Sequence, residues 1–308
     1  MMESILIDGL VKAYGRREVL HGIDLSVPAG GIFGLIGPNG AGKTTIMRCL
    51  LDVIRPSAGT LSVLGRSPRE AGPALRRRIG YLPGDLVLEG RTTGRRLLRH
   101  YAELGGPVRP GRAETLAERL GVDLDAQVRR LSKGNKQKIG LIQALMHEPE
   151  LLVLDEPTSG LDPLMQREFL LLLREATARG QTVFLSSHML SQVQQAADSV
   201  AILRDGRIAL VAGVESLRET ARRRVRIAVS SDDEPALRGI LGRLDGLRDR
   251  AVVPGTAGDA GTTIATATVE GPVGPLVRAL AGIDVVDLVL EEPDLEEAVL
   301  TLYGGERS

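Results

Sequence analysis

The residues best suited to chemistry lie in one glycine-rich stretch. They are Gly37, Pro38, Asn39, Gly40, Ala41, Gly42, Lys43, Thr44 and Thr45. Their order fits the G-x-x-x-x-G-K-[ST] pattern of a loop that binds nucleotide phosphates, with a strand expected before it and a helix after it, to about Ile54. Glycines let the backbone N–H groups curl round an anion, and the positive end of the helix faces the same charge. We expect Lys43 to reach the β and γ phosphates, Thr44 to ligate Mg²⁺ and Thr45 to donate near the α phosphate. The alternative is a glycine-rich turn with a surface lysine.

A second chemical pair, Asp155 and Glu156, follows the apolar run Leu151 to Leu154. A buried parallel strand would hold both carboxylates at the edge of a sheet where ligands of open α/β sheets bind. We expect Asp155 to hold the magnesium ion and Glu156 to polarise a water molecule for attack on the γ phosphate. The alternative is a pair of acids that caps a helix, because Pro157 and Thr158 come next.

A third segment reads Leu131-Ser132-Lys133-Gly134-Asn135-Lys136-Gln137. Along the chain the phosphate loop comes first, this segment second and the acid pair third, and together in that order they resemble the ATP-binding cassette (ABC) ATPases, a resemblance that covers Ile5 to about Val211. The segment departs from the family signature L-S-G-G-Q at Lys133 and Asn135. We expect Ser132 to cap a helix running to about His147 and Gly134 to let the start of that helix approach a γ phosphate. A capped helix with a basic first turn is the alternative, although cations are disfavoured at that end.

The resemblance also implies roles for more isolated residues. His188 would contact the γ phosphate and orient Glu156, and Tyr14 would stack on adenine. The segment Ser159 to Asp162 resembles the family's D-loop at a dimer seam, or Asp162 is only a helix cap. Where the family has a glutamine that touches magnesium, this chain has Gly84 followed by Asp85. Either Asp85 supplies a metal ligand or that contact is missing.

These motifs need a scaffold, and hydrophobic patterning divides the chain into two domains. Residues 1–216 are expected to form an α/β domain with the ABC-ATPase P-loop fold, a mixed sheet core with a helical signature subdomain at about 92–147. Within that subdomain Leu97, Leu98, Tyr101 and Leu104 recur at helical spacing. Residues 217–308 are expected to form a small α+β domain of order βαββαβ, ending in a helix from Asp294 to Tyr303.

Composition limits the classes of function. Thirty-nine basic residues balance thirty-nine acidic ones, so no global positive field attracts nucleic acid, and none is expected as a partner. The one cysteine, Cys49, excludes an internal disulfide and is expected to be a buried thiol. No apolar run reaches the roughly 20 residues of a membrane-spanning helix, and no secretory signal is found. We therefore expect a cytoplasmic protein, and the resemblance implies that it is peripheral on the inner face of the cell membrane.

The resemblance implies how such a chain works. ATP and Mg²⁺ would lie between the phosphate loop of one chain and Ser132 and Gly134 of another, in a homodimer, and transmembrane permease subunits would be the other partners. The signature, the segment Gly80 to Pro83 and the C-terminal residues Glu292 to Glu297 resemble ATPases of bacterial ABC-2 type exporters, such as the daunorubicin-resistance kind. The alternative is a soluble ABC ATPase that acts on nucleic acid or the ribosome. It is opposed by the short helices between the nucleotide motifs and by the single phosphate loop. A nucleotide kinase is a third class, which would lack the signature.

Overall fold

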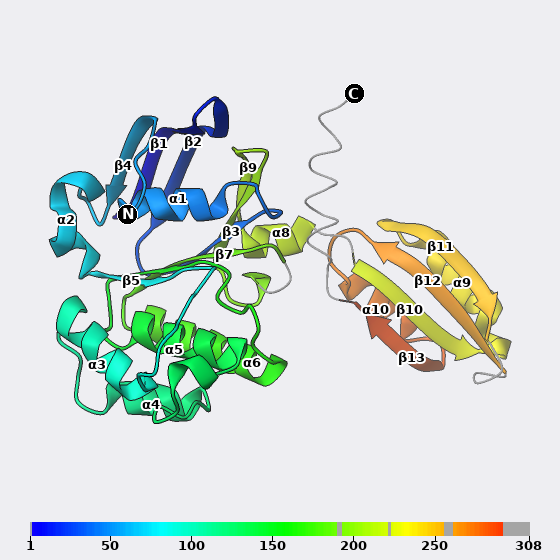
Figure 1. The fold of residues 1–308 in the computed structure, drawn as a ribbon. Helices are drawn as coiled ribbons and strands as arrows, with labels where there is room; N and C mark the ends of the chain where they lie inside the picture. The colour runs from blue at the N-terminus through cyan, green and yellow to red at the C-terminus, as the bar shows by residue number, and fades with distance from the viewer. Residues whose placement is uncertain (1, 190–192, 221–222, 256–260, 292–308) are drawn as a thin grey trace. The chain divides into compact units, whose positions relative to one another are not determined.

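The computed structural model describes residues 2–189, 193–220, 223–255 and 261–291 of the chain (Figure 1). The chain divides into two compact units, Met1–Gly213 and Val214–Ser308. Each unit is described by itself below. None of the described helices is long and apolar enough to cross a bilayer.

The first unit is organised by a six-stranded sheet. Its strands are β3 (Ile32–Ile36), β5 (Ile79–Leu82), β6 (Leu151–Leu154), β7 (Thr182–Ser187), β8 (Ser199–Arg204) and β9 (Arg207–Gly213), in the spatial order β5-β6-β7-β3-β8-β9. The first five in that order are parallel, and β9 pairs with β8 as an antiparallel hairpin. All four side chains of β6 are buried, as expected for a parallel strand covered on both faces. The carboxyl ends of β3, β7 and β6 therefore lie side by side at one edge.

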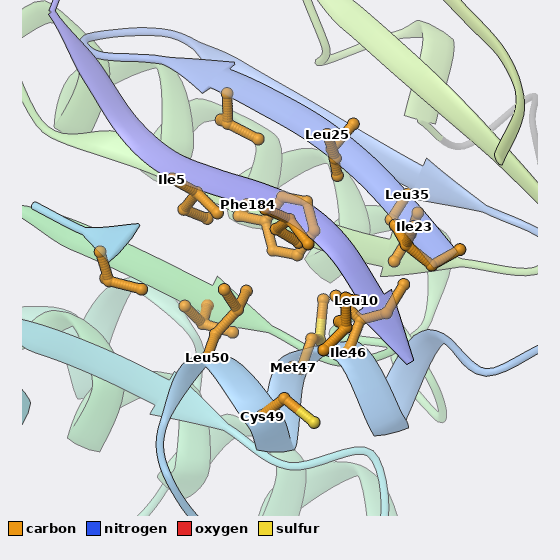
Figure 2. Close-up of a cluster of buried hydrophobic side chains, with 14 of the residues drawn as sticks. Ile5, Leu10, Ile23, Leu25, Leu35, Ile46, Met47, Cys49, Leu50 and Phe184 are labelled. Atoms are coloured by element: carbon orange, nitrogen blue, oxygen red, sulfur yellow. The ribbon is translucent and has the colours of Figure 1, made fainter. Parts of the chain in front are cut away.

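A smaller antiparallel sheet covers one face of this sheet. It has the order β2-β1-β4 and comprises β1 (Glu3–Tyr14), β2 (Arg17–Pro28) and β4 (Ala58–Val63). The helix α1 (Lys43–Leu50) contributes Ile46, Met47, Cys49 and Leu50 to the apolar core shared with both sheets (Figure 2). It is shorter than the helix predicted to about Ile54, because the chain turns at Leu51 and Asp52 adopts a positive φ of 54°. This core fixes the first residue of α1, Lys43, at the end of the phosphate loop.

The opposite face is covered by the helices α5 (Lys133–Leu145) and α6 (Pro163–Ala178) (Figure 1). The described part of the first unit also contains the helices α2 (Pro68–Arg76), α3 (Gly94–Gly105) and α4 (Arg112–Arg119) and the 3₁₀ helix η1 (Val128–Arg130). The helix α5 contacts β5, while α3 and α4 pack against α5. The four residues that recur at helical spacing do lie on one helix, α3, in which Leu98 is buried and Leu104 is 60% exposed. The last turn of α3 projects Leu104 into solvent.

The second unit begins with α8 (Val214–Thr220) and continues as β10 (Arg223–Ser230), η2 (Ser231–Asp233), α9 (Glu234–Arg243), β11 (Leu247–Pro254), β12 (Thr262–Val269), α10 (Gly274–Leu280) and β13 (Val285–Leu290). Its antiparallel sheet has the order β11-β12-β10-β13. Alternate residues of β10, such as Ile227 and Val229, pack with Leu237 and Leu241 of α9 and Leu276 of α10 in a separate core. The helix expected from Asp294 to Tyr303 lies outside the described residues.

Candidate active site

Three segments meet at the carboxyl edge of the six-stranded sheet. The loop of residues 37–42 joins β3 to α1, and Asp155 and Glu156 follow β6. Ser186 and Ser187 are the last residues of β7, and His188 follows them. Because β3, β7 and β6 are adjacent, the sheet brings together residues more than a hundred positions apart. This edge is where a ligand of an open α/β sheet binds.

Lys43 is directed back over the loop that precedes it. Its side chain is 6% exposed, and Nζ donates to the carbonyl oxygens of Gly37 at 2.6 Å and Pro38 at 3.3 Å. Nζ also lies 3.3 Å from Oε1 of Glu156. The loop carbonyls thus hold a nearly buried cation at the site, where it faces the carboxylate after β6.

Asp155 is the most enclosed acid of the site, at 1% exposure. Its Oδ2 accepts from Thr44 Oγ1 at 2.6 Å, and its Oδ1 accepts from Ser186 Oγ at 2.5 Å. Both carboxylate oxygens are therefore oriented by hydroxyl groups, which compensates the cost of burying the charge. Burial, and after it the charge of Asp155, raises the pKa of the neighbouring Tyr81 phenol, which stays protonated.

Glu156 occupies a strained and partly unsatisfied position. Its φ is 48°, a left-handed conformation that costs a non-glycine residue about 1–3 kcal/mol. Its backbone N–H donates to Ser186 Oγ at 3.0 Å, and Oε2 lies 2.8 Å from Nδ1 of His188. Oε1 is buried and has no hydrogen-bond partner within the described residues, since Lys43 is at ion-pair distance but not in hydrogen-bond geometry. One acceptor of this carboxylate is thus held ready for a further donor.

The signature helix α5 is linked to this carboxylate through its own chain. Ser132 caps the helix, accepting from the backbone N–H of Asn135 at 3.2 Å. Gln137, which is 4% exposed, donates through Nε2 to the carbonyl oxygens of Glu156 at 3.4 Å and Pro157 at 3.2 Å. The first turn of α5 is thereby tied to the loop that carries Glu156.

Gly134 is constrained by a contact that the sequence does not reveal. A Cβ built on it would lie 2.5 Å from the carbonyl oxygen of Gly160, a separation that real Cβ atoms essentially never show. Gly160 belongs to the loop of residues 157–162 in the same chain, which ends where Asp162 caps α6 by accepting from Met165 N at 3.0 Å. A glycine is therefore needed at 134 even before any ligand is considered.

Not every predicted residue joins this network. Tyr14 lies at the β1–β2 hairpin, 49% exposed, with Lys12 Nζ 4.9 Å from its ring centroid. Ser132 is exposed, and the described structure records no contact of Ser132 or Gly134 with the phosphate loop of the same chain. Asp85 is also exposed, and no contact with Thr44 or Asp155 is recorded for it in the described part of the chain. Instead Gly84 approaches the metal-ligand candidate: its ideal Cβ would lie 3.1 Å from Asp155 Oδ2.

Two residues of the network received no role from the sequence, Ser186 and Gln137. The signal for Ser186 was a serine at the end of an apolar run, just before a chemically important histidine. The sequence feature that could have pointed to Gln137 was an amide side chain one turn into the helix that carries the signature segment. In both cases the partner was 19 or more residues away, so spacing along the chain gave no reason to join them.

The chemistry of the donors fits a nucleoside triphosphate with Mg²⁺. Thr44 and Asp155 present two hard oxygen atoms 2.6 Å apart. Mg²⁺ is usually held by one or two such protein ligands, with phosphate oxygens and water completing its octahedron. Lys43 and the N-terminus of α1 would face the phosphates. When bound, the ion would draw charge from the phosphate oxygens.

Comparison with known proteins identifies the family. The ABC transporter family matches residues 20–159. A daunorubicin resistance ATP-binding protein of Streptomyces coeruleorubidus is 33% identical over 99% of this chain and 97% of its own length. A fluoroquinolones export ATP-binding protein of Mycobacterium tuberculosis is 35% identical over 80% of this chain and 83% of its own. The solved structure of an ATP binding subunit of an ABC transporter has a TM-score of 0.63 and 30% identity, over 70% of this chain and 91% of that one.

These similarities confirm the resemblance and the α/β fold with the ABC-ATPase P-loop architecture predicted from the sequence. The chain belongs to the ABC transporter ATP-binding proteins, and within that family it is a nucleotide-binding ATPase of the exporter type.

Proposed function

We propose that the site binds ATP together with Mg²⁺ and hydrolyses the terminal phosphate. The loop from Gly37 to Thr45 would hold the phosphates, Thr44 and Asp155 would ligate Mg²⁺, and Tyr14 would stack on the adenine ring. One observation carries the proposal. Glu156 is held between Lys43 and His188 with one buried carboxylate oxygen free to accept a hydrogen bond.

That free oxygen suits a general base. A water molecule donating to Oε1 of Glu156 would be polarised for in-line attack on the γ phosphate. His188 would keep the carboxylate oriented through Oε2, and Lys43 would balance charge on the transferred group. Ser186 joins this set as a positioning residue, because it contacts Asp155 and Glu156 at once.

A second copy of the chain would complete the site. Ser132 is exposed at the start of α5 and does not contact the phosphate loop of its own chain. An exposed, capped helix N-terminus can bind an anion presented by another molecule. In a head-to-tail homodimer, Ser132 and Gly134 of each copy would face the ATP on the other, so two equivalent sites would close together.

A substitution that blocks hydrolysis tests this arrangement. Glu156→Gln keeps the shape of the side chain but removes its basicity, so we expect turnover to fall by about 10²–10⁴ and an ATP-bound dimer to accumulate. Light scattering after size exclusion, with ATP and Mg²⁺, should report twice the monomer mass. Glu118→Gln, at an exposed acid on α4, should stay active and monomeric. A Glu156→Gln chain that binds ATP yet remains monomeric would refute the two-copy site.

We further propose that the dimer powers an ABC-2 type exporter. The relatives named above are a daunorubicin resistance ATP-binding protein and a fluoroquinolones export ATP-binding protein. In this chain the segment 92–130 would meet transmembrane permease subunits at the inner face of the membrane. No nucleic-acid partner is proposed. If a membrane protein is encoded beside this chain, co-expression of the two should yield a complex that survives detergent extraction and hydrolyses ATP. A chain that is active on ATP but never co-purifies with a membrane protein would contradict the transport assignment alone.

A further inference from the structure

The ring of Tyr14 is exposed at the end of a strand. Tyr14 is the last residue of β1, and 49% of its surface is exposed. The proposed function places the adenine base on this ring. A side chain that is free to turn in solvent must be immobilised when a ligand stacks on it, and that loss of freedom lowers the affinity. A group that already holds the ring in place would therefore favour nucleotide binding.

Lys12 lies over one face of the Tyr14 ring. The distance from Nζ of Lys12 to the ring centroid is 4.9 Å, which is within the range of a cation–π interaction. The lysine precedes the tyrosine by two positions on the same strand. One face of the ring is thus covered by a cation, so a base has only the opposite face on which to stack.

The ammonium group of Lys12 is itself held in place. Its Nζ donates to the carbonyl oxygen of Arg55 at 2.8 Å. The chain just after Arg55 is bound to β1, because the N–H of Ser57 donates to the carbonyl oxygen of Val11 at 2.8 Å. The Oγ of Ser57 also accepts from the N–H of Ala13 at 3.0 Å. Within the described part of the chain Lys12 forms no ion pair, so its charge remains available to the ring.

The strand that carries Lys12 and Tyr14 lies beside the phosphate loop. Lys12 pairs with Leu20 of β2. An ideal Cβ on Gly42, the residue just before α1, would lie 2.6 Å from Cδ2 of Leu20, so β2 packs directly against the loop. From Lys12 to Tyr14 the strand advances about 7 Å. The ring is therefore within reach of a base whose phosphates lie on the loop.

We propose that Lys12 holds the Tyr14 ring in place and leaves only its outer face for the adenine base. The inference deepens the proposed function and rests on it for the stacking of adenine on Tyr14. A ring that is already fixed by a cation and a backbone carbonyl loses less freedom when the base stacks on it. Lys12 acts through Tyr14, so it is a positioning residue rather than a catalytic one.

Binding of ADP and of inorganic pyrophosphate, each with Mg²⁺, tests this role by calorimetry on the full-length chain. An exposed cation–π contact corresponds to about a two- to fivefold change in an equilibrium constant, so Lys12→Met should weaken ADP binding by about that factor. Pyrophosphate has no base, and its affinity should not change. Lys12→Arg keeps a cation that stacks on aromatic rings and should bind ADP about as the parent does. Arg69→Met, at an exposed arginine on α2, controls for overall charge and should bind both ligands like the parent.

A double-mutant cycle separates the ring from other causes. In a Tyr14→Ala background Lys12→Met should have no further effect on ADP affinity, because the ring through which the lysine acts is gone. In the chain that keeps Tyr14, Lys12→Met should raise KM for ATP by the same factor as the ADP dissociation constant and leave kcat unchanged. A lysine that only tied β1 to Arg55 would lower the melting temperature without changing the ratio of the affinities for ADP and pyrophosphate.

Three results would overturn the proposal and leave the proposed ATP hydrolysis intact. These are an unchanged ADP affinity in Lys12→Met, an equal weakening of pyrophosphate binding, and an equal loss of ADP affinity with and without Tyr14. A Tyr14→Ala chain that binds ADP as the parent does would reject the stacking of adenine on Tyr14, and this inference with it. A parent chain that binds neither ligand would instead refute the proposed function itself.

Discussion

Replacing Gly134 with alanine separates two explanations for a glycine in the signature segment. One explanation is that the helix N-terminus must come close to a γ phosphate. The other is the contact within the chain, where an ideal Cβ would lie 2.5 Å from the carbonyl oxygen of Gly160. Only the second predicts an effect in the absence of nucleotide.

The size of that effect can be worked from the contact. A carbon and an oxygen approach to about 3.3 Å at closest, so the loop or the helix must move by about 0.8 Å. Overpacking of this kind costs roughly 1–3 kcal/mol, offset by about 0.5–1 kcal/mol because alanine favours a helix over glycine. The middle of these ranges is a net loss of about 1.3 kcal/mol, which lowers the melting temperature of a unit of this size by about 3–5 °C.

Thermal unfolding of nucleotide-free protein, followed by circular dichroism, measures the shift. Gly105→Ala is the matched control, because that glycine ends α3 and an ideal Cβ there has no neighbour within 4 Å. It should be neutral or slightly stabilising. If Gly134→Ala melts no lower than the parent while ATP turnover collapses, the contact with Gly160 is not the constraint, and the approach to phosphate is.

The remaining predictions concern groups buried in the first unit. Ser186→Ala removes a hydrogen bond to the buried Asp155, so urea unfolding should show a loss of about 1.5–3 kcal/mol of stability, and ATP turnover should also fall. The control Ser4→Ala removes a hydrogen bond far from the site and should leave turnover unchanged. Burial lowers the pKa of His147, so the unfolded chain binds the extra proton; stability should fall as pH drops below about 6.5, and less so in His147→Asn. Burial raises the pKa of the Cys49 thiol to about 11, so a thiol reagent at pH 8 should label it only on unfolding, and rapid labelling of native protein would contradict its burial.

The sequence predicted the elements whose signals are local. The strand of Leu151–Leu154 was placed with its correct bounds because four consecutive apolar residues end abruptly in two acids. The end of α1 was misplaced because Leu51, Val53 and Ile54, which follow the helix, continue its apolar pattern although the backbone has already turned.

The same distinction holds for the candidate site: residues in local motifs were predicted, and residues that act through contacts between distant segments were not. Lys43, Thr44, Asp155, Glu156 and His188 were predicted as one set and do lie together, because motif order fixes the strands that carry them. Ser186 and Gln137 could not be given roles, since each acts through a contact between distant segments. Their partners become visible only when the parallel order of β6 and β7 and the position of α5 are known.

Gly84 shows how a departure from the family pattern can carry its own structural reason. In the sequence, Gly84 stands where the family has a glutamine that touches magnesium. One interpretation was that the neighbouring side chain of Asp85 makes that contact instead. In the folded chain the backbone at Gly84 instead approaches Asp155 so closely that even a Cβ would stand 3.1 Å from Oδ2. That separation is tighter than nine in ten real Cβ contacts, so a glutamine here would require Asp155 or the loop to give way by a few tenths of an ångström. Oδ2 of Asp155 also accepts the hydrogen bond from Thr44. A shift of the backbone at Gly84 would therefore act directly on the two proposed magnesium ligands, without a glutamine side chain in between.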